Sequence, residues 1–266
     1  MISSARRRGV FAALSAALLF GFFSVSSPTP ANAGITSTER SVIKWINADR
    51  EARGLRALRP WTTLYDIAEM RAKRMAAANV MSHTISGNLG SQLTGYGVRY
   101  YGKGENIAYT SMYTGRDAAK HIYQMWKGSP VHWAQILSTK FNYVGIGLSY
   151  RSSNNRTYAS LVFTESPDHT RPNAWITGAS KSGKDIVWTW HGTDVPLQTH
   201  TAGFRDFDVQ YRIDSGSWRT ARDNTTVTTL TMFGKPSGHT YGLRVRGRDR
   251  AGNVGSWSAE TRVSLP

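Results

Sequence analysis

The residue pattern changes near position 167, and this change constrains the fold more than any other feature of the chain. Before it, apolar residues recur every three or four positions and then give way to short β-like runs. After it, short segments alternate apolar and polar residues. The intervening stretch is rich in turn formers at 166–173 and in small polar residues at 178–184. We therefore predict two domains, 34–168 and 185–266, joined by a linker at 169–184.

The first 33 residues have the pattern of an export signal. Arg6, Arg7 and Arg8 form a positive start, and Ala31-Asn32-Ala33 is a small-x-small cleavage site. The apolar run between them, 10–25, is about 16 residues long, whereas a membrane-spanning helix needs roughly 20. We predict a cleaved signal peptide at 1–33 and a secreted, extracellular protein, with association to the cell wall as a further option.

The chain contains no cysteine. Small exported domains often depend on disulfides, so each domain here must be stable through apolar burial alone. The 233 residues that follow the leader are enough for two domains of ordinary size.

The charge balance is strongly basic. Residues 34–266 carry 30 basic and 17 acidic side chains once the three leader arginines are set aside, a formal net charge of +13. Such a protein is attracted to polyanions, although the same charge also keeps a secreted protein soluble. We expect a lipid or an anionic cell-wall polymer as partner, with peripheral contact to membrane or wall, and no specific nucleic acid.

Apolar spacing predicts mixed α and β structure in the first domain, with helices preceding an antiparallel sheet. The second domain is predicted to be a β-sandwich, because its alternating runs are short and separated by turns. The expected helices are 38–52, 62–76, 116–127 and a short one after Pro130; the expected strands are 105–109, 143–150, 157–164, 185–190, 208–213 and 241–248.

Three separate segments supply candidate chemistry: Ser82-His83, 104–108 and 126–132. Their titratable residues are His83, Glu105 and His132, and two imidazoles with a carboxylate can hold a divalent metal or move protons near neutral pH. The first hypothesis is a metal such as zinc on the two histidines, with Glu105 as ligand, orienting group or water-positioning group. The second is acid–base hydrolysis of a peptide, ester or glycan bond by Glu105 and a histidine. The third is a ligand pocket or a hydrogen-bonded structural network.

The serines beside the histidines are weaker candidates. Ser82 and Ser129 lie close to a histidine in sequence, but neither sits in a Gly-x-Ser-x-Gly turn. Both are interpreted as helix-end residues.

Five tyrosines between positions 96 and 113 surround the segment of Glu105. Aromatic side chains near a cleft can form an apolar wall for a lipid or stack on sugars, although aromatics are also common in strands. The ligand-binding candidates are Tyr101, Asn106, Tyr109 and Trp126.

A set of short motifs in fixed order extends over residues 36–165. They are Asn47 with Arg50, Gly54-Leu55, Leu64, Ala68 and Met75, His83, 104–107, Trp126, Ser129-Pro130, His132, 136–137 and 144–147. In this order the segment resembles the CAP superfamily of cysteine-rich secretory proteins, antigen 5 and pathogenesis-related proteins. It is most similar to the cysteine-free bacterial branch.

The resemblance implies an α-β-α sandwich whose cleft gathers two histidines and two acidic residues. His83, Glu105 and His132 match three of these positions. No acid lies between His83 and Glu105, where the nearest polar residues are Asn88 and Gln92. The missing acid argues against chemistry that needs paired carboxylates. Sterol and fatty-acid binding by relatives implies a lipid or cell-wall ligand here, with a peptidase-like hydrolase of the cell envelope as the alternative.

The second domain resembles bacterial fibronectin type III modules at 209–218 and 240–257. The resemblance implies that Tyr241 is near the tyrosine-corner position and that Trp188 or Trp190 fills the core. Arg244, Arg246 and Arg248 share one strand face by the period of two, with Arg212 on a neighbouring strand. This row could bind anionic glycans or phosphates, or be an ordinary solvated sheet face. The module is expected to serve as a spacer or binding accessory.

Overall fold

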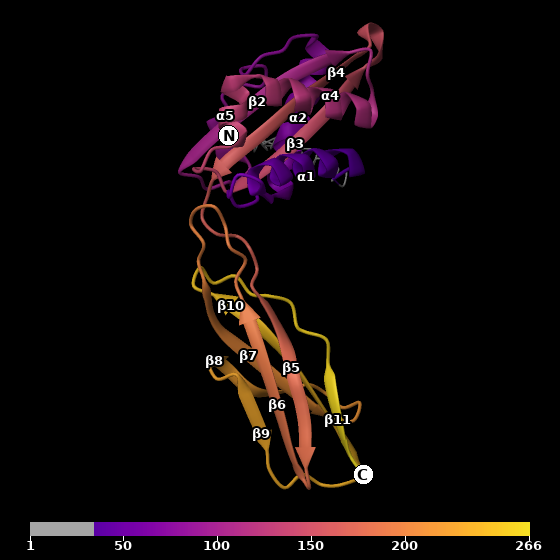
Figure 1. The fold of residues 1–266 in the computed structure, drawn as a ribbon, viewed down its shortest axis with the longest axis vertical. Helices are drawn as coiled ribbons and strands as arrows, with labels where there is room; N and C mark the ends of the chain where they lie inside the picture. Colours follow the sequence, from indigo (N-terminus) through magenta and orange to yellow (C-terminus); the bar gives the residue numbers. More distant parts are fainter. Residues whose placement is uncertain (1–34) are drawn as a thin grey trace, which may run out of the picture. The chain divides into compact units, whose positions relative to one another are not determined.

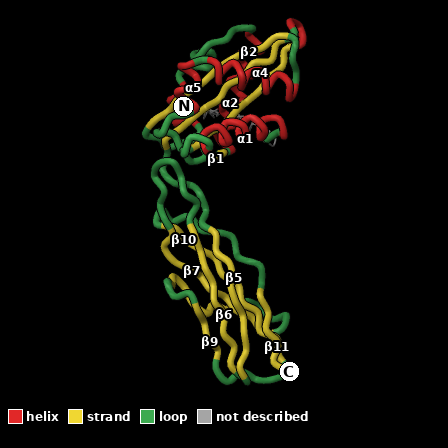
Figure 2. Tube along the Cα trace, in the orientation of Figure 1, coloured by secondary structure: helices red, strands yellow, loops and turns green. Residues whose placement is uncertain are grey.

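The structure, a computed structural model, describes residues 35–266. The predicted signal peptide at 1–33 therefore lies outside the described residues. Helices and one sheet form the N-terminal domain, whereas the segment after it contains strands and loops (Figures 1 and 2). No helix within 35–266 combines the length and apolar character needed to cross a membrane.

The helices of the first domain begin and end at residues with clear local causes. Thr36 precedes the first helix, and its side chain accepts a hydrogen bond from the backbone of Glu39 while Glu39 bonds back to Thr36, a capping box. Asn79 adopts the left-handed conformation and ends the second helix. Pro130 occupies the first turn of the fifth. The helices are α1 (Ser37–Glu51), α2 (Thr62–Ala78), α3 (Leu89–Gly95), α4 (Gly115–Gly128) and α5 (Pro130–Ile136).

The sheet of this domain has four strands in the order β1-β3-β4-β2. β2, β4 and β3 are antiparallel neighbours, and β1 pairs with β3 in parallel. The β3–β4 turn contains the short 3-10 helix η1 (Ser152–Asn154). The strands are β1 (Arg59–Pro60), β2 (Gly102–Ser111), β3 (Tyr143–Arg151) and β4 (Arg156–Glu165).

Helices cover both faces of this sheet. Alternate residues of a strand point to opposite faces. Tyr143 of β3 packs in a cluster with Leu64 of α2, while its neighbour Val144 packs in another with α1 and α4 residues. The predicted α-β-α sandwich is confirmed, and β2 is its edge strand on the side of α4 and α5.

Two glycines of β3 allow α2 to lie directly on the sheet. A Cβ atom at Gly145 would lie 2.2 Å from the Leu64 backbone, and one at Gly147 would lie 2.2 Å from the Glu69 backbone. No real Cβ tolerates such contacts, so α2 can pack this closely only against a backbone without side chains.

The second domain is a sandwich of two antiparallel sheets, as predicted. One sheet has the order β5-β6-β9 and the other has the order β11-β10-β7-β8. The strands are β5 (Asn173–Ser182), β6 (Asp185–Thr193), β7 (Phe204–Ile213), β8 (Arg219–Thr225), β9 (Thr229–Met232), β10 (His239–Asp249) and β11 (Thr261–Leu265).

The core residues expected for the second domain are at their expected places. Trp188 and Trp190 are both buried, so the core takes both indoles rather than one of them. The buried Tyr241 donates its hydroxyl to the carbonyl of Pro236 at 3.1 Å, the bond that defines a tyrosine corner.

The predicted linker at 169–184 is wrong for most of its length. Residues from Asn173 to Ser182 form β5, and Gly183, with a φ of +58°, allows the tight turn into β6. β5 is an edge strand whose inner side chains, such as Ile176, pack on the core, while Asn173, Trp175 and Thr177 lie on its exposed side. Small polar composition thus marked an exposed edge strand instead of a flexible connector.

Candidate functional site

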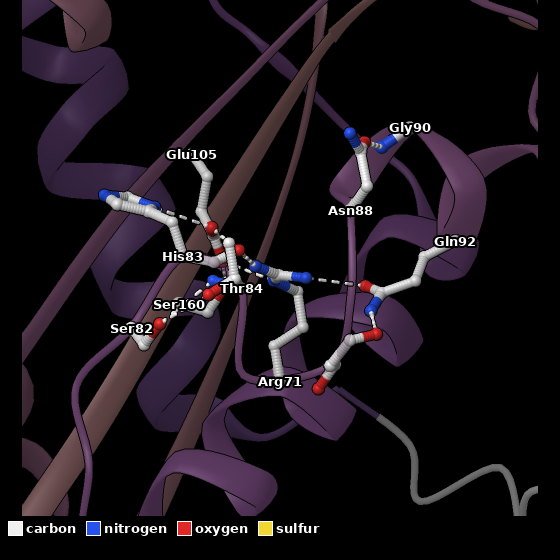
Figure 3. Close-up of polar contacts among 10 residues, drawn as sticks. Arg71, Ser82, His83, Thr84, Asn88, Gly90, Gln92, Glu105 and Ser160 are labelled. Carbon is white, nitrogen blue, oxygen red and sulfur yellow. Dashed lines mark hydrogen bonds and ion pairs between the residues drawn. The ribbon is translucent and has the colours of Figure 1, made fainter.

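Glu105 is the centre of a buried polar network on β2 (Figure 3). Its Oε1 accepts hydrogen bonds from Arg71 Nε at 2.5 Å and Ser160 Oγ at 2.7 Å. Its Oε2 accepts from Arg71 Nη2 at 2.8 Å and contacts His83 Nδ1 at 2.9 Å. A carboxylate offers about four lone-pair directions, so these four bonds leave none for a substrate or a metal.

Arg71 is a fully buried residue of α2 that neutralises Glu105. The remaining guanidinium donors bind the carbonyl of His83 at 2.5 Å and Gln92 Oε1 at 2.8 Å. A buried cation is tolerated only when it is paired and hydrogen-bonded, and every edge of this guanidinium meets an acceptor. Glu105 therefore has a cation beside it and no second carboxylate.

Sequence reasoning missed the role of Arg71. Arg71 lies on the buried face of the second helix with Ala68 and Ala72, where a charge requires an internal partner. A charged residue on the buried face of a helix was the sequence signal that could have identified this role. Of the two polar residues considered for the missing acid, Gln92 joins the network through Arg71, whereas Asn88 accepts from Gly90 N at 2.7 Å and caps α3.

His83 lies in the turn that follows α2, with its side chain 57% exposed. Because a carboxylate can only accept, the Nδ1 of His83 carries the proton that Glu105 Oε2 receives. Its Nε2 has no hydrogen-bond partner among residues 35–266. The network therefore fixes the tautomer of His83 and leaves a free nitrogen toward solvent.

His132 lies in the first turn of α5. Its Nδ1 contacts Ser129 Oγ at 2.8 Å, and its backbone carbonyl accepts from Asn106 Nδ2 at 2.9 Å. The expectation that Ser129 is a helix-end residue is confirmed, but its hydroxyl also faces the histidine, which sequence proximity alone did not indicate. Burial, and then repulsion from His83, lower the pKa of His132.

The two histidines reach the edge strand β2 from opposite faces of the sheet. Glu105 and Asn106 are consecutive and point to opposite faces. Glu105 binds His83 on the side of α2, and Asn106 binds the backbone of His132 on the side of α5. Repulsion from His83 contributes to the lowered pKa of His132, so the two imidazoles interact electrostatically.

A groove of about 370 Å³ lies beside this cluster. Ser129 and His132 line one part of it, and Trp126 donates its indole N–H to the carbonyl of Ile107 at 3.3 Å in its wall. The remaining wall is apolar or aromatic and comes from Met81, Ile107, Tyr109, Met125 and Trp126.

The four predicted ligand-binding residues occupy different places relative to this groove. Tyr109 and Trp126 line the groove. Asn106 is buried and holds the backbone of α5, so it positions His132. Tyr101 lies outside this groove: it is 64% exposed and packs on His200, 4.7 Å between ring centroids. Six residues of extended chain separate it from Ile107, a distance of about 20 Å.

The donor atoms of His83, Glu105 and His132 do not form a three-ligand metal site. Within the described part of the chain, three ligand atoms lie within 4.8 Å of one another only in the group Asp168, Asp194 and Asp249. Those carboxylates already accept backbone N–H bonds, for example Asp194 from Gly203 at 2.6 Å. The oxygens of Glu105 are likewise occupied, so a zinc ion held by all three predicted residues does not fit this arrangement.

The pKa of His132 provides a test of this geometry. We expect it below the ordinary value of 6.5, and we expect it to rise in His83→Ala, because a repelling cation is removed. A lowered folded-state pKa means that the unfolded chain takes up the proton first, so His132 contributes stability above pH 6.5 that is lost as pH falls. NMR titration of the imidazole protons measures both values. An unchanged midpoint in His83→Ala would show that the two rings are not neighbours.

An α-β-α sandwich with two histidines and a glutamate at its edge strand, beside a groove, defines a CAP-type domain. Residues 43–164 match the sequence model of the cysteine-rich secretory protein family, CAP. The first domain of the chain is therefore a CAP domain, and it contains no cysteine.

Three known proteins are similar to the first domain. Protein YkwD of Bacillus subtilis strain 168 is 28% identical over 125 residues, 46% of each chain, so the match spans about half the length of that relative. An extracellular SCP-domain protein from Bacillus anthracis is 25% identical over 48% of this chain and 40% of that one, with a TM-score of 0.40. An outer surface protein from Borrelia burgdorferi is 16% identical over 50% of this chain and 96% of that one, with a TM-score of 0.45.

Proposed function

We propose that this is a secreted binding protein whose CAP domain takes up an amphipathic ligand of the cell envelope. The apolar part of the ligand lies along the wall formed by Met81, Met125 and Trp126, and its polar end meets His132 and Ser129. The observation that carries this proposal is an apolar groove of about 370 Å³ with histidine at one end. Small-molecule sites have volumes of about 300–1,000 Å³ and combine an apolar lining with few polar groups.

The composition of the groove favours a flexible apolar chain as occupant. Met125 is 43% exposed and Met81 48% exposed, although both are long apolar residues that burial would stabilise. Methionine adapts its shape to different ligands because its side chain is unbranched and polarizable. An acyl or prenyl segment would cover these side chains and gain apolar burial on both surfaces.

The network around Glu105 argues for binding over acid–base hydrolysis. A general base must be able to reach the proton that it removes. Both oxygens of Glu105 are held by Arg71, Ser160 and His83 inside the domain. The groups left for a ligand are the two imidazole Nε2 atoms.

The same two Nε2 atoms are the ring nitrogens that could still bind a metal ion. Metal-binding histidines usually bond through the other ring nitrogen to an orienting group, and here the Nδ1 atoms meet Glu105 and Ser129. His83 and His132 would hold a zinc or another divalent ion only as a two-imidazole pair completed by water or ligand. Metal analysis of protein purified without added zinc, alongside His83→Ala, tests this.

The groove proposal predicts a large loss of affinity when a charge is placed in the groove wall. Met125→Glu should weaken binding of cis-parinaric acid, a fluorescent fatty acid, by at least tenfold, because a carboxylate in the wall opposes apolar contact. The measurement is a fluorescence titration of the chain without its leader. Met112→Glu is the matched control, since Met112 is 88% exposed and lies outside the groove.

Equal affinity of the two variants would place the fatty acid elsewhere on the protein. Absence of binding by the unaltered chain would remove the acyl class of ligand. Retained binding in Met112→Glu together with loss in Met125→Glu supports the groove.

A further inference from the structure

The second domain carries a stack of alternating arginine and tryptophan side chains on the sheet that contains β7 and β10. We call it the Arg–Trp stack, and it consists of Arg212, Trp218, Arg244, Trp257 and Arg246. Arg212 and Arg244 lie over Trp218, 4.7 and 4.1 Å from the guanidinium carbon to the ring centroid. Arg244 and Arg246 lie over Trp257 at 4.6 and 4.5 Å. Arg244 is therefore held between two indole rings.

Arg212 and Arg246 of the stack, and the adjacent Arg248, each bind a carboxylate. Arg248 is opposite Asp206, and Arg246 is opposite Asp208, with Nε–Oδ distances of 3.0 and 2.9 Å. At the other end, Arg212 is opposite Gly242 and binds Glu260 with its Nε at 2.8 Å.

Gly242 makes that last ion pair possible. A Cβ there would lie 1.9 Å from Glu260 Oε1, so the missing side chain leaves the space through which Glu260 reaches Arg212. Arg212, Arg246 and Arg248 each have a carboxylate partner, which a merely solvated sheet face would not require.

Arg244 breaks this pattern, because the residue opposite it is Gln210. Its Nε and Nη2 donate to Gln210 Oε1 at 3.1 and 2.6 Å. Within residues 35–266 it forms no ion pair with a carboxylate, and Nη1 has no hydrogen-bond acceptor. Burial, and then the cations Arg212 and Arg246, lower the pKa of Arg244, while Glu260 raises it, so the positive charge of Arg244 is only partly compensated.

We propose that Arg244 is the binding point for one oxyanion, a carboxylate or a phosphate, carried by an extracellular polymer. The free edge of the guanidinium presents parallel N–H donors, the geometry that suits both groups. The indoles hold it flat before the anion arrives, so little rotamer freedom is lost on binding. Two guanidinium groups already lie over Trp218 and two over Trp257, so the site recognises the charge and not a stacked sugar ring.

Gln210→Glu is the sharpest test, because it places a carboxylate directly opposite Arg244. The full chain without its leader is passed at fixed ionic strength over immobilised polygalacturonate, which carries carboxylates, and poly(glycerol phosphate), which carries phosphodiesters. The unaltered protein should bind at least one polymer, and Gln210→Glu should bind it at least tenfold more weakly. The polymer that binds identifies the class of anion.

A matched control separates this site from general charge attraction. Ser180→Glu adds the same charge on β5 of the other sheet, at an exposed position, and should change affinity less than twofold. Arg244→Gln, which removes the cation and leaves two amides, should lose binding as Gln210→Glu does. Equal affinity of Gln210→Glu and unaltered protein, or no binding to either polymer, would overturn the proposal. Because Arg244 and the groove lie in different domains, either result leaves the fatty-acid test unaffected.

Discussion

Glu105→Gln is expected to lower the free energy of unfolding by about 3–5 kcal/mol, the usual cost of removing one partner from a buried ion pair. The change leaves Arg71 fully buried, facing a neutral amide that offers one acceptor oxygen in place of two. It also removes an acceptor from Ser160 or His83. Chemical denaturation followed by far-UV circular dichroism measures the loss.

A double-mutant cycle distinguishes the ion pair from other effects of the same substitution. Arg71→Met alone leaves an unpaired carboxylate and should be similarly destabilising, whereas Arg71→Met with Glu105→Gln should cost much less than the sum of the two. Additive losses, or a loss below about 1 kcal/mol in Glu105→Gln, would contradict a coupled buried pair.

This expectation changes how a loss of function in Glu105→Gln should be interpreted. A catalytic role would leave folding intact and remove turnover. The contacts of Glu105 instead predict that folding, the orientation of His83 and ligand binding decline together. Stability must therefore be measured before any activity of that variant is assigned to chemistry.

Gly147→Ala is expected to destabilise the first domain by about 3 kcal/mol or more, at the upper end of overpacking costs. The new Cβ would lie 2.2–2.3 Å from backbone atoms of Glu69 in α2, and a helix backbone cannot rotate away as a flexible side chain can. α2 also carries Arg71, so its displacement should disturb the Glu105 network.

The control for this substitution is Gly95→Ala at the end of α3. Nothing lies within 4 Å of the new Cβ there, and alanine is the better helix former, so no loss is expected. Thermal unfolding of both variants decides the matter: similar melting temperatures would mean that α2 does not pack on the β3 backbone as described.

Local patterns predicted the elements of the first domain because each had a local cause. The helix from Thr62 follows a helical stripe, and Pro130 starts a short helix in which its missing N–H costs nothing. α3 was not predicted, since its seven residues are mostly small or polar and are stabilised by packing of Leu89 and Leu93 under α2. Such tertiary stabilisation has no periodic signature in the sequence.

The site was only partly predictable for a related reason. Motif order pointed to Glu105 and His83, which bond to each other, but what a carboxylate does depends on its neighbours in space. Arg71 and Ser160, distant in sequence, occupy the oxygens that catalysis or metal binding would need. Tyr101 was grouped with Tyr109 by proximity in sequence, yet extended chain carries neighbours far apart.

The central claim, that the groove holds an apolar chain, is tested most directly by mass spectrometry of lipids extracted from purified protein. Unaltered protein and Met125→Glu would be expressed and purified in parallel, with Met112→Glu beside them. We predict a lipid species enriched in the unaltered protein and in Met112→Glu and depleted at least tenfold in Met125→Glu. The same lipid content in all three preparations would contradict the claim.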